Sequence, residues 1–234
     1  MVNVTSASKT DVGRKRDHNE DFVWSSDELG IYIVADGLGG YDAGEVASQM
    51  ATKIASEAIK KHLVQHPPQT SPEQLQQLLI DTLETTNKKI YNAAQQDGQH
   101  QKMGTTIVLA LLQLPTVYIS HAGDSRAYLI REGQMRQLTE DDVWMATGNL
   151  RNVLTKAIGQ EHALEPSFYN YTLNSGDWLL LCSDGLWNML PDEQILAVFE
   201  QNNQSPTTLT DALIKAANNA GGLDNITVTT LKIV

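Results

Sequence analysis

Aspartates stand beside strand-like segments at widely separated points of this sequence. They are Asp21 in HNED, Asp36 in ADGLGG, Asp124 in HAGDSR, Asp184 in CSDGL and Asp224 in GGLDNIT. Any one Asp-Gly at the end of a strand is typical of a tight turn. The repeated placement favours a different interpretation, in which the carboxylates converge on one site.

Converging carboxylates need cations between them. Two bare carboxylates ~4 Å apart repel each other by about 4 kcal/mol at an effective dielectric constant near 20. Oxygen ligands without cysteine pairs or paired histidines suit the hard ions Mg²⁺ and Mn²⁺ rather than zinc. Glycine after Asp36 lets the backbone approach an ion, so Gly37 is a candidate carbonyl ligand. The residues alone therefore predict a Mg²⁺ or Mn²⁺ site, with isolated turns as the alternative.

Helical and strand-like patterns divide the rest of the chain between them. Apolar residues recur at helical spacing in residues 43–65 and again after Ser71, where SPEQ supplies an N-cap and a proline at the first helical position. Further helices are predicted at 189–201 and 205–222, the latter closed by Gly221 and Gly222. The predicted strands are residues 21–24, 30–35, 105–112, 117–121, 127–131, 168–173, 178–182 and 226–234.

The short turns LPT and EGQ between strands favour antiparallel hairpins, so the fold class is α+β rather than a doubly wound sheet. A chain of 234 residues without a linker-like tract predicts one domain, residues 1–234. Its 41% hydrophobic content suffices for a core without disulfides. The single cysteine, Cys182, lies in an apolar run and is expected to be a buried, inert thiol.

The overall charge restricts the class of partner. A formal net charge of −11 argues against binding to nucleic acid, because affinity for phosphate backbones depends on clustered Lys and Arg. No apolar run approaches the ~20 residues of a membrane span, and the first residues lack the apolar core of a signal peptide. The sequence therefore predicts a cytoplasmic protein with no membrane or nucleic-acid partner.

Seven short motifs follow one another along the chain: RDHNED, VADGLGG, MGTT, AGDSRAY, NVLTKAIG, LLCSDGL and DNITV. In this order they resemble the motif series of the metal-dependent protein serine/threonine phosphatases of the PPM, or PP2C, family, in its compact bacterial form. The resemblance extends from Arg16 to Val228. Each motif alone is weak, but the ordered series is highly specific.

The resemblance implies a role for each matching residue. Asp36 would bridge two Mn²⁺ or Mg²⁺ ions, with the Gly37 carbonyl on one ion and Asp184 and Asp224 on the other. Glu20 and Asp21 would act through metal-bound waters, and Asp124 would help to hold a third, weaker metal. Arg16 matches the family's phosphate-binding arginine, whereas Arg14 and Lys15 beside it are expected to be solvated. The implied architecture is a four-layer αββα fold, an antiparallel β-sandwich flanked by helix pairs.

The implied activity is hydrolysis of phosphoserine and phosphothreonine by a water activated between two metal ions, without a covalent intermediate. The implied partner is a phosphorylated protein substrate, made by an opposing serine/threonine kinase and met by a monomeric enzyme. One alternative is a pseudophosphatase, a regulatory module that binds phosphoproteins with weak or no catalysis. Another is an unrelated metal hydrolase of small phosphoesters.

The chain departs from the family pattern where relatives offer histidine. Leu38 follows the first Asp-Gly, Tyr41 follows GG, and Asp142 ends LTEDD where relatives have L-T-x-D-H. No general acid is assigned as a result. His18 and His121 lie beside motif residues, and packing is the favoured interpretation for His121.

A second departure is a missing segment. Relatives usually carry a helical flap between LTxDH and the NVLT motif, but only residues 143–151 fill that space here. The flap is therefore expected to be deleted or reduced to a turn, which leaves a more open site with looser peptide selectivity or one completed by a partner protein. Trp144 and Met145 are candidates to cap the shortened edge, with ordinary packing as the alternative.

Overall fold

Two antiparallel β-sheets form the centre of the molecule in the computed structural model, which describes residues 4–39, 42–65, 71–96, 103–144 and 153–234. The first sheet has, in spatial order, β1 (Val4–Asp11), β13 (Ile226–Ile233), β12 (Trp178–Cys182), β7 (Arg126–Arg131) and β8 (Gln134–Gln137). The second has β11 (Ser167–Thr172), β6 (Thr116–Ala122), β5 (Ile107–Gln113), β3 (Ile31–Leu38) and β2 (Asp21–Ser26), and β4 (Gly104–Thr105) pairs with the end of β3.

Strand β3 shows why the sheets are stacked. Its side chains alternate between two faces, as the pleat of a strand requires. Ile31 and Ile33 belong to the core beneath the helices, and Tyr32 and Val34 to the core between the sheets. All of these side chains are fully buried, so this strand needs a covering layer on each face.

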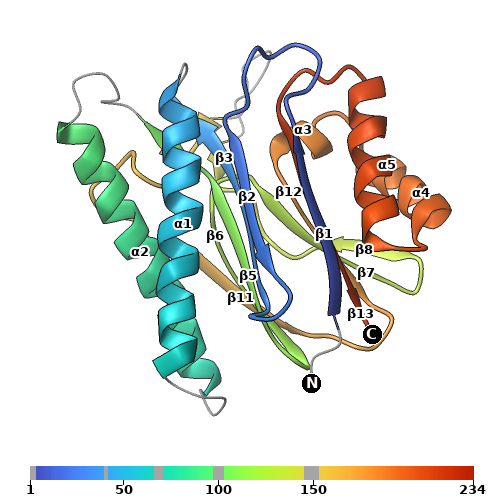
Figure 1. The fold of residues 1–234 in the computed structure, drawn as a ribbon, viewed down its shortest axis with the longest axis horizontal. Helices are drawn as coiled ribbons and strands as arrows, with labels where there is room; N and C mark the ends of the chain where they lie inside the picture. Colours follow the sequence, from blue (N-terminus) through green and yellow to red (C-terminus); the bar gives the residue numbers. More distant parts are fainter. Residues whose placement is uncertain (1–3, 40–41, 66–70, 97–102, 145–152) are drawn as a thin grey trace.

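Helices supply the two outer layers. α1 (Asp42–Gln65) and α2 (Pro72–Gln96) cover the second sheet, and α4 (Asp192–Asn202) and α5 (Pro206–Asn219) cover the first (Figure 1). A short helix, α3 (Asp184–Trp187), follows β12. The predicted four-layer αββα arrangement is confirmed, as are the predicted helices and their pairing.

Helix caps agree with the sequence pattern. Ser71 Oγ accepts a hydrogen bond from Gln74 N at 3.4 Å, and Ser205 Oγ accepts one from Thr208 N at 3.1 Å.

None of the described helices combines the length and apolar character that crossing a bilayer requires.

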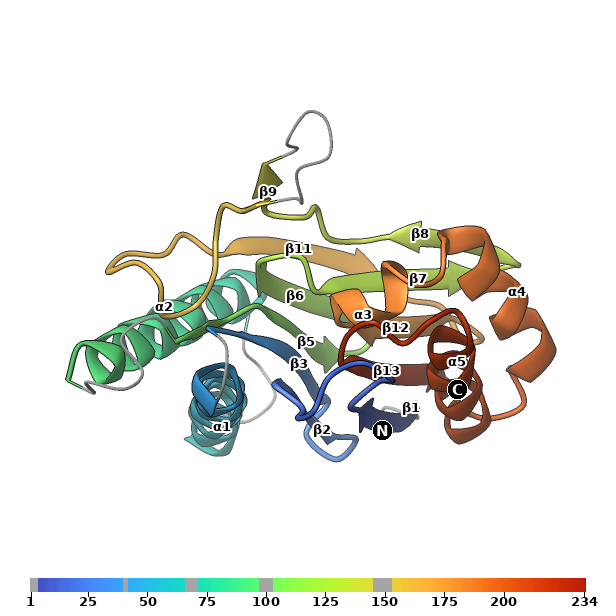
Figure 2. The ribbon, with the colours of Figure 1, turned by 90° about the horizontal axis from the view of Figure 1, so that it is seen from above.

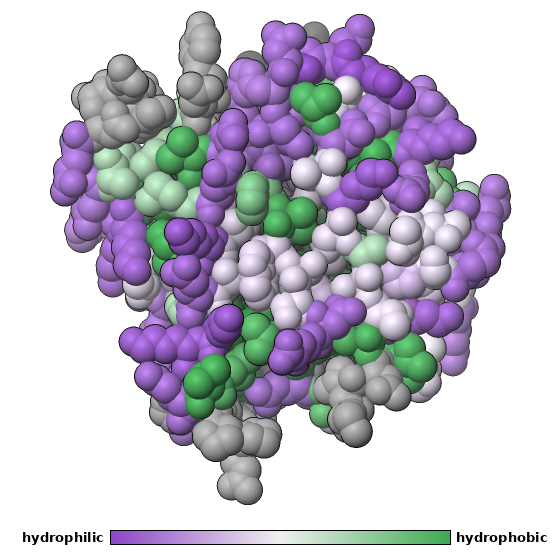
Figure 3. Space-filling view, in the orientation of Figure 1, coloured by the Kyte–Doolittle hydropathy of each residue, from purple (hydrophilic) through white to green (hydrophobic). Residues whose placement is uncertain are grey.

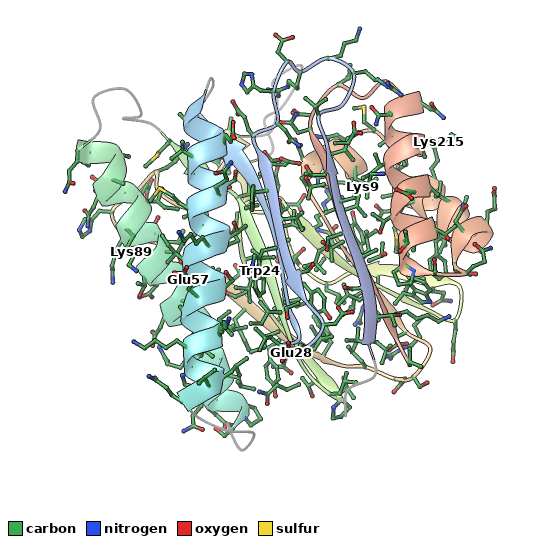
Figure 4. All side chains as sticks on the ribbon, in the orientation of Figure 1. Lys9, Trp24, Glu28, Glu57, Lys89 and Lys215 are labelled. Atoms are coloured by element: carbon green, nitrogen blue, oxygen red, sulfur yellow. The ribbon has the colours of Figure 1, made fainter. Side chains whose placement is uncertain are left out.

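Strand β1 was absent from the sequence prediction. Its residues, VTSASKTD, are mostly small and polar, and Figure 3 shows a pale surface, neither strongly hydrophilic nor strongly hydrophobic, across the centre of this face. β1 is ordered by tertiary contacts, because all eight of its residues pair with β13 and Lys9 forms an ion pair with Asp211 of α5. Figure 4 shows Lys9 on β1 beside this helix, and Trp24 of β2 beside α1 near Glu57.

The predicted strand 105–112 is interrupted at Thr106. Thr105 pairs with Gly37 as part of β4, and β5 begins only at Ile107. The β3 strand correspondingly runs on to Leu38, past its predicted end at residue 35. Asp36 therefore lies within a strand rather than in a turn, which excludes the tight-turn interpretation at this position.

A two-stranded ribbon, β9 (Val143–Trp144) with β10 (Val153–Leu154), stands out from the stacked layers (Figure 2). It occupies the place in the sequence where the flap was expected to be shortened. Residues 145–152, which include Met145 and most of that segment, lie outside the described residues. Trp144 is 77% exposed, so its exposure does not support the interpretation that it caps the edge against the described residues.

Candidate active site

A polar pocket of about 360 Å³ lies where strands of both sheets end. Residues from distant parts of the chain form it: Arg16, Glu20, Asp36, Gly37, Leu38, Gly39, Thr106, Asp124, Leu154, Asp184, Asp224 and Asn225. Every predicted site residue except Asp21 lines this pocket. Asp21 is buried directly beside it, opposite Asp36 in the β2–β3 register.

The antiparallel register explains the convergence. The first residue of β2, Asp21, pairs with Asp36 near the end of β3, so both carboxylates lie at one edge of the second sheet. In the first sheet, Cys182 at the end of β12 pairs with Arg126 at the start of β7 and with Val228 near the start of β13. The residues just outside these strand ends therefore meet, and they include Asp124, Asp184 and Asp224.

The carboxylates in the pocket resist ionisation. Burial is the largest cause that raises the pKa of Asp36 well above its ordinary value, and nearby carboxylates, Asp21 first among them, raise it further. Burial and Asp184 raise the pKa of Asp124 to about 7, and burial and Asp224 raise that of Asp184 to about 6. This environment favours any cation that enters.

Asp21 has a different environment, because it accepts hydrogen bonds from Ser183 and Thr227. Ser183 Oγ donates to Asp21 Oδ2 at 2.7 Å. Burial nevertheless raises the pKa of Asp21 to about 7, although hydrogen bonds from Ser183 and Thr227 oppose this shift. Asp21 therefore supports the electrostatic character of the site from beside the pocket rather than from its surface.

Arg16 brings a positive charge to this acidic pocket. Its Nη2 donates to Asp224 Oδ2 at 2.7 Å, and the two side chains are 46% and 33% exposed. A guanidinium has five N–H donors. The bond to Asp224 uses only one of them, so the group retains donors for another anion.

Gly37 is required by close packing. A Cβ on Gly37 would lie 2.3 Å from Gly44 O and 2.5 Å from Glu20 O, and Gly37 N donates to Glu20 O at 3.1 Å. The sequence interpretation attributed this glycine to the approach of an ion. The structure gives a second reason, the close contact of β3 with the start of α1 and with Glu20.

The donor set fits hard divalent cations. All candidate ligands are carboxylate or carbonyl oxygens. Within the part of the chain that the structure describes, no three His, Cys, Asp or Glu side chains are arranged to hold a metal ion by themselves. Mg²⁺ tolerates this situation, because it is commonly bound by one or two carboxylates and keeps several waters.

Comparison with known proteins decides the family. The sequence model of Protein phosphatase 2C matches residues 13–216. The chain belongs to the protein phosphatase 2C family. It is 37% identical to the serine/threonine phosphatase stp of Listeria innocua, over 94% of this chain and 92% of that protein.

Solved phosphatase structures have the same fold. The Mycobacterium tuberculosis serine/threonine phosphatase PstP/Ppp superimposes with a TM-score of 0.87 at 30% identity, over 100% of this chain and 99% of that chain. The catalytic domain of PstP in complex with two manganese ions gives a TM-score of 0.84 at 29% identity, over 99% and 98% of the two chains. The predictions of family, fold class and enzyme class, a metal-dependent serine/threonine phosphatase, are confirmed.

Several pocket residues of this phosphatase were missed because they are neutral. Thr106 N donates to Asp36 O at 2.8 Å, and Thr106 Oγ1 accepts from Asp36 N at 3.2 Å. Asn225 Oδ1 accepts from Glu20 N at 2.8 Å. These residues lie in the MGTT and DNIT motifs, which were the available signal, but a search for ionisable groups passes over them.

Neither histidine considered as a proton donor is placed in the pocket of this phosphatase. His121 is fully buried, and its ring stacks on Tyr169 with 5.7 Å between centroids. His18 lies at the surface, with Nε2 3.3 Å from Glu20 Oε1. Leu38 lines the pocket, and Tyr41 lies outside the described residues. The favoured interpretation of His121 as a packing residue agrees with its burial.

Proposed function

We propose that the pocket hydrolyses phosphoserine and phosphothreonine in protein substrates, with Mn²⁺ or Mg²⁺ as cofactor. The observation that carries this proposal is the cluster of carboxylates with raised pKa beside an arginine that retains free donors. The PstP complex with two manganese ions supports manganese as one suitable metal. The pseudophosphatase alternative is not favoured, because a binding module has no need of a carboxylate cluster that is costly to ionise.

In this proposal each residue has one role. Asp36, the Gly37 carbonyl, Asp184 and Asp224 would hold the two ions, with Asp36 shared between them. Asp124 would help to hold a third ion, and Glu20 and Asp21 would act through metal-bound water. The ions supply an activated water and neutralise charge on the phosphoryl group.

Arg16 binds and orients the phosphoryl oxygens. Its guanidinium donates one hydrogen bond to Asp224, which holds it at the edge of the pocket. Other N–H groups remain for two parallel hydrogen bonds to a phosphoryl group. Leu38 and Leu154 add apolar surface to the same pocket, which limits the water that reaches the reacting group.

Cys182 takes no part in this chemistry. It is buried and does not line the pocket, and burial raises the pKa of its thiol far above the ordinary value. A thiolate nucleophile is therefore disfavoured.

The cellular setting follows from the reaction. A phosphatase of this class consumes what a serine/threonine kinase makes, so we place residues 1–234 as a monomeric domain in signal transduction, in the cytoplasm where ATP supports phosphorylation. The net charge of −11 opposes binding to nucleic acid or to an acidic membrane surface.

The decisive experiment measures hydrolysis of p-nitrophenyl phosphate and of a phosphothreonine peptide with Mn²⁺ and with Mg²⁺. Asp184→Ala is expected to abolish both activities, and Asp81→Ala, at an exposed position of α2 outside the pocket, to retain them. Arg16→Ala is expected to raise KM for the peptide, whereas Lys15→Ala, its neighbour outside the pocket, is expected to leave KM unchanged. Hydrolysis that needs no metal, or that survives in Asp184→Ala, would exclude the proposed mechanism.

A further inference from the structure

Asp142 stands where the family resemblance leads one to expect histidine, and the structure gives it an unusual set of partners. Its Oδ2 accepts a hydrogen bond from Gly123 N at 3.1 Å, and its Oδ1 lies 2.8 Å from Lys156 Nζ. Its backbone N donates to Gly123 O at 3.0 Å, and its carbonyl accepts from Thr155 N at 2.8 Å. One residue thus binds two segments that meet at the pocket.

The first of these segments is the turn that carries Asp124. Gly123 has a φ of +107°, and a Cβ there would lie 2.7 Å from Thr106 Cβ, so its geometry is closely constrained. On the other side of Asp124, Ser125 Oγ lies 2.7 Å from Thr106 Oγ1. The Asp124 carbonyl accepts a hydrogen bond from Trp187 Nε1 at 3.1 Å. Asp142 supplies the remaining anchor of this turn.

The second segment lies on the side of the pocket where β10 ends. Leu154 lines the catalytic pocket and also a neighbouring groove of about 300 Å³ that Thr155 and Lys156 share. Lys156 is held by two groups, Asp142 Oδ1 at 2.8 Å and Ser167 Oγ at 3.2 Å. Because the groove shares Leu154 with the pocket, a polypeptide that flanks a phosphorylated residue would lie next to it.

The ion pair is partly shielded from solvent, on its Asp142 side most of all. The Asp142 side chain is 10% exposed and that of Lys156 34% exposed, and the buried ring of His121 places Nδ1 3.6 Å from Asp142 Oδ2. Shielded pairs with additional hydrogen bonds hold their geometry better than pairs on the open surface.

We propose that Asp142 is a positioning residue that couples the Asp124 turn to the substrate-side segment 154–156, through one carboxylate oxygen for each. This inference rests on the proposed phosphatase function and assigns a residue beyond its machinery. Loss of the Gly123 contact loosens the turn and weakens the binding of the metal that Asp124 helps to hold. Loss of the Lys156 contact releases the groove and weakens binding of peptide substrates.

Variants can separate the two effects. Asp142→Asn keeps an oxygen for Gly123 N but removes the ion pair, as does Lys156→Met. Both are expected to raise KM for a phosphothreonine peptide about 3- to 10-fold, more than KM for p-nitrophenyl phosphate, and the double variant is expected to be no worse than either single one. Asp142→Ala also removes the acceptor for Gly123, and is expected to raise the Mn²⁺ concentration for half-maximal activity by about 3- to 10-fold.

A matched control shows what a purely structural aspartate does. Asp177 likewise accepts a backbone N–H, from Asn174 at 2.7 Å, and pairs with Arg131 at 2.6 Å, but it lies at the opposite end of β12. Asp177→Ala is expected to lower the melting temperature while peptide KM and the Mn²⁺ requirement stay within twofold of wild type.

The inference is overturned if the Asp142 and Lys156 variants fold and change neither readout, or if Asp177→Ala changes both equally. If Asp142→Ala fails to fold, the additivity of Asp142→Asn and Lys156→Met still decides the coupling. Failure of the wild type to hydrolyse phosphopeptides with any metal would count against the proposed function instead, so the two failures are distinguishable.

Discussion

The two ends of the adjacent strands β7 and β12 treat aspartate in opposite ways. At one end, Asp177 is 3% exposed and receives two hydrogen bonds from Arg131, at 2.8 and 2.6 Å. At the other end, burial raises the pKa of Asp124 to about 7 and that of Asp184 to about 6. The same residue type is thus paired with an arginine at one end, whereas at the other end burial and neighbouring carboxylates outweigh the nearby arginines.

The difference is not a shortage of arginine. Arg126 begins β7 at the pocket end, yet its Nη2 binds Asp141 Oδ2 at 2.7 Å and its guanidinium stacks 3.7 Å from the centre of the Trp187 ring. Asp141 and Asp177 are each paired with an arginine, whereas the carboxylates of the pocket face one another. We interpret this unequal treatment as a sign that the pocket binds a ligand. Such local conflicts with stability are expected at functional sites.

The sharpest way to break this comparison is to neutralise one aspartate at each end. Asp184→Asn is expected to reduce kcat/KM on the order of 10²- to 10³-fold, because several kcal/mol of transition-state stabilisation are lost. In metal-free protein, it is expected to raise the melting temperature by relieving repulsion. Asp177→Asn is expected to do the reverse, with near wild-type kcat/KM and a stability loss of about 1–2 kcal/mol. Calorimetry and phosphopeptide kinetics on both variants measure these opposite effects on stability and on kcat/KM. Two variants that change both quantities in the same way would contradict the prediction.

Metal should stabilise only through the pocket end. Mn²⁺ at about 100 times its dissociation constant adds about 2.7 kcal/mol to the free energy of unfolding, which raises the melting temperature of a chain of this size by about 5–10 °C. Thermal melts with Mn²⁺ and with EDTA measure this shift. Asp177→Asn is expected to retain it and Asp184→Asn to lose most of it. A shift of equal size in both variants would place the ion elsewhere.

The pH dependence of stability sharpens the contrast further. The pKa of Asp21 and of Asp124 rises to about 7 and that of Asp184 to about 6 in the folded protein, from 3.8 for an exposed aspartate. These carboxyls hold a proton more tightly in the folded state than in the unfolded state. Without metal, their contribution therefore favours folding below pH 4 and is lost as pH rises from about 4 to about 7.

The measurement compares melting temperatures in EDTA at pH 5.5 and pH 8 for wild type and Asp184→Asn. The variant is expected to lose several degrees less than wild type over this interval. With Mn²⁺ present the wild-type trend is expected to reverse, because protons compete with the metal for the carboxylates. Parallel curves for the two proteins in EDTA would remove Asp184 from the titrating group.

The smallest expected effect concerns Cys182, the last residue of β12 at the pocket end. Cys182→Ala is expected to keep kcat/KM within twofold of wild type, because the thiol is buried and does not line the pocket. Native protein is expected to resist alkylation by iodoacetamide that labels the unfolded chain. Inactivation by alkylation of the native protein would show that the thiol is accessible and near the site.

The sequence was sufficient to predict the aspartates of the pocket and most of the strands. Apolar strands such as β5 and β12 can be predicted from their local composition, and the acidic residues near strand ends can then be located. The ordered motifs added the helix-flanked sandwich. Residue types and spacing thus carried the parts of the structure that depend on local pattern.

Features that depend on distant contacts were not predictable. β1 is held by pairing with β13, and the break at Thr106 exists because this residue bonds to Asp36 across the sheet edge. The need for glycine at position 37 comes from Gly44 and Glu20, one after it in the chain and one before. The roles of neutral residues such as Ser183 and Asn225 can be seen only in the structure, where they form hydrogen bonds with Asp21 and Glu20.

The pairing of β1 with β13 has a consequence for biosynthesis. The first and the last of the described strands are neighbours, and Asp224 lies two residues before the last one begins. During translation the ribosome must therefore deliver nearly all of this chain before the first sheet and the pocket can close. A nascent chain that carries Asp36 but not yet Asp224 lacks one of the proposed ligands, so the pocket can bind its metals in full only after Asp224 has been translated.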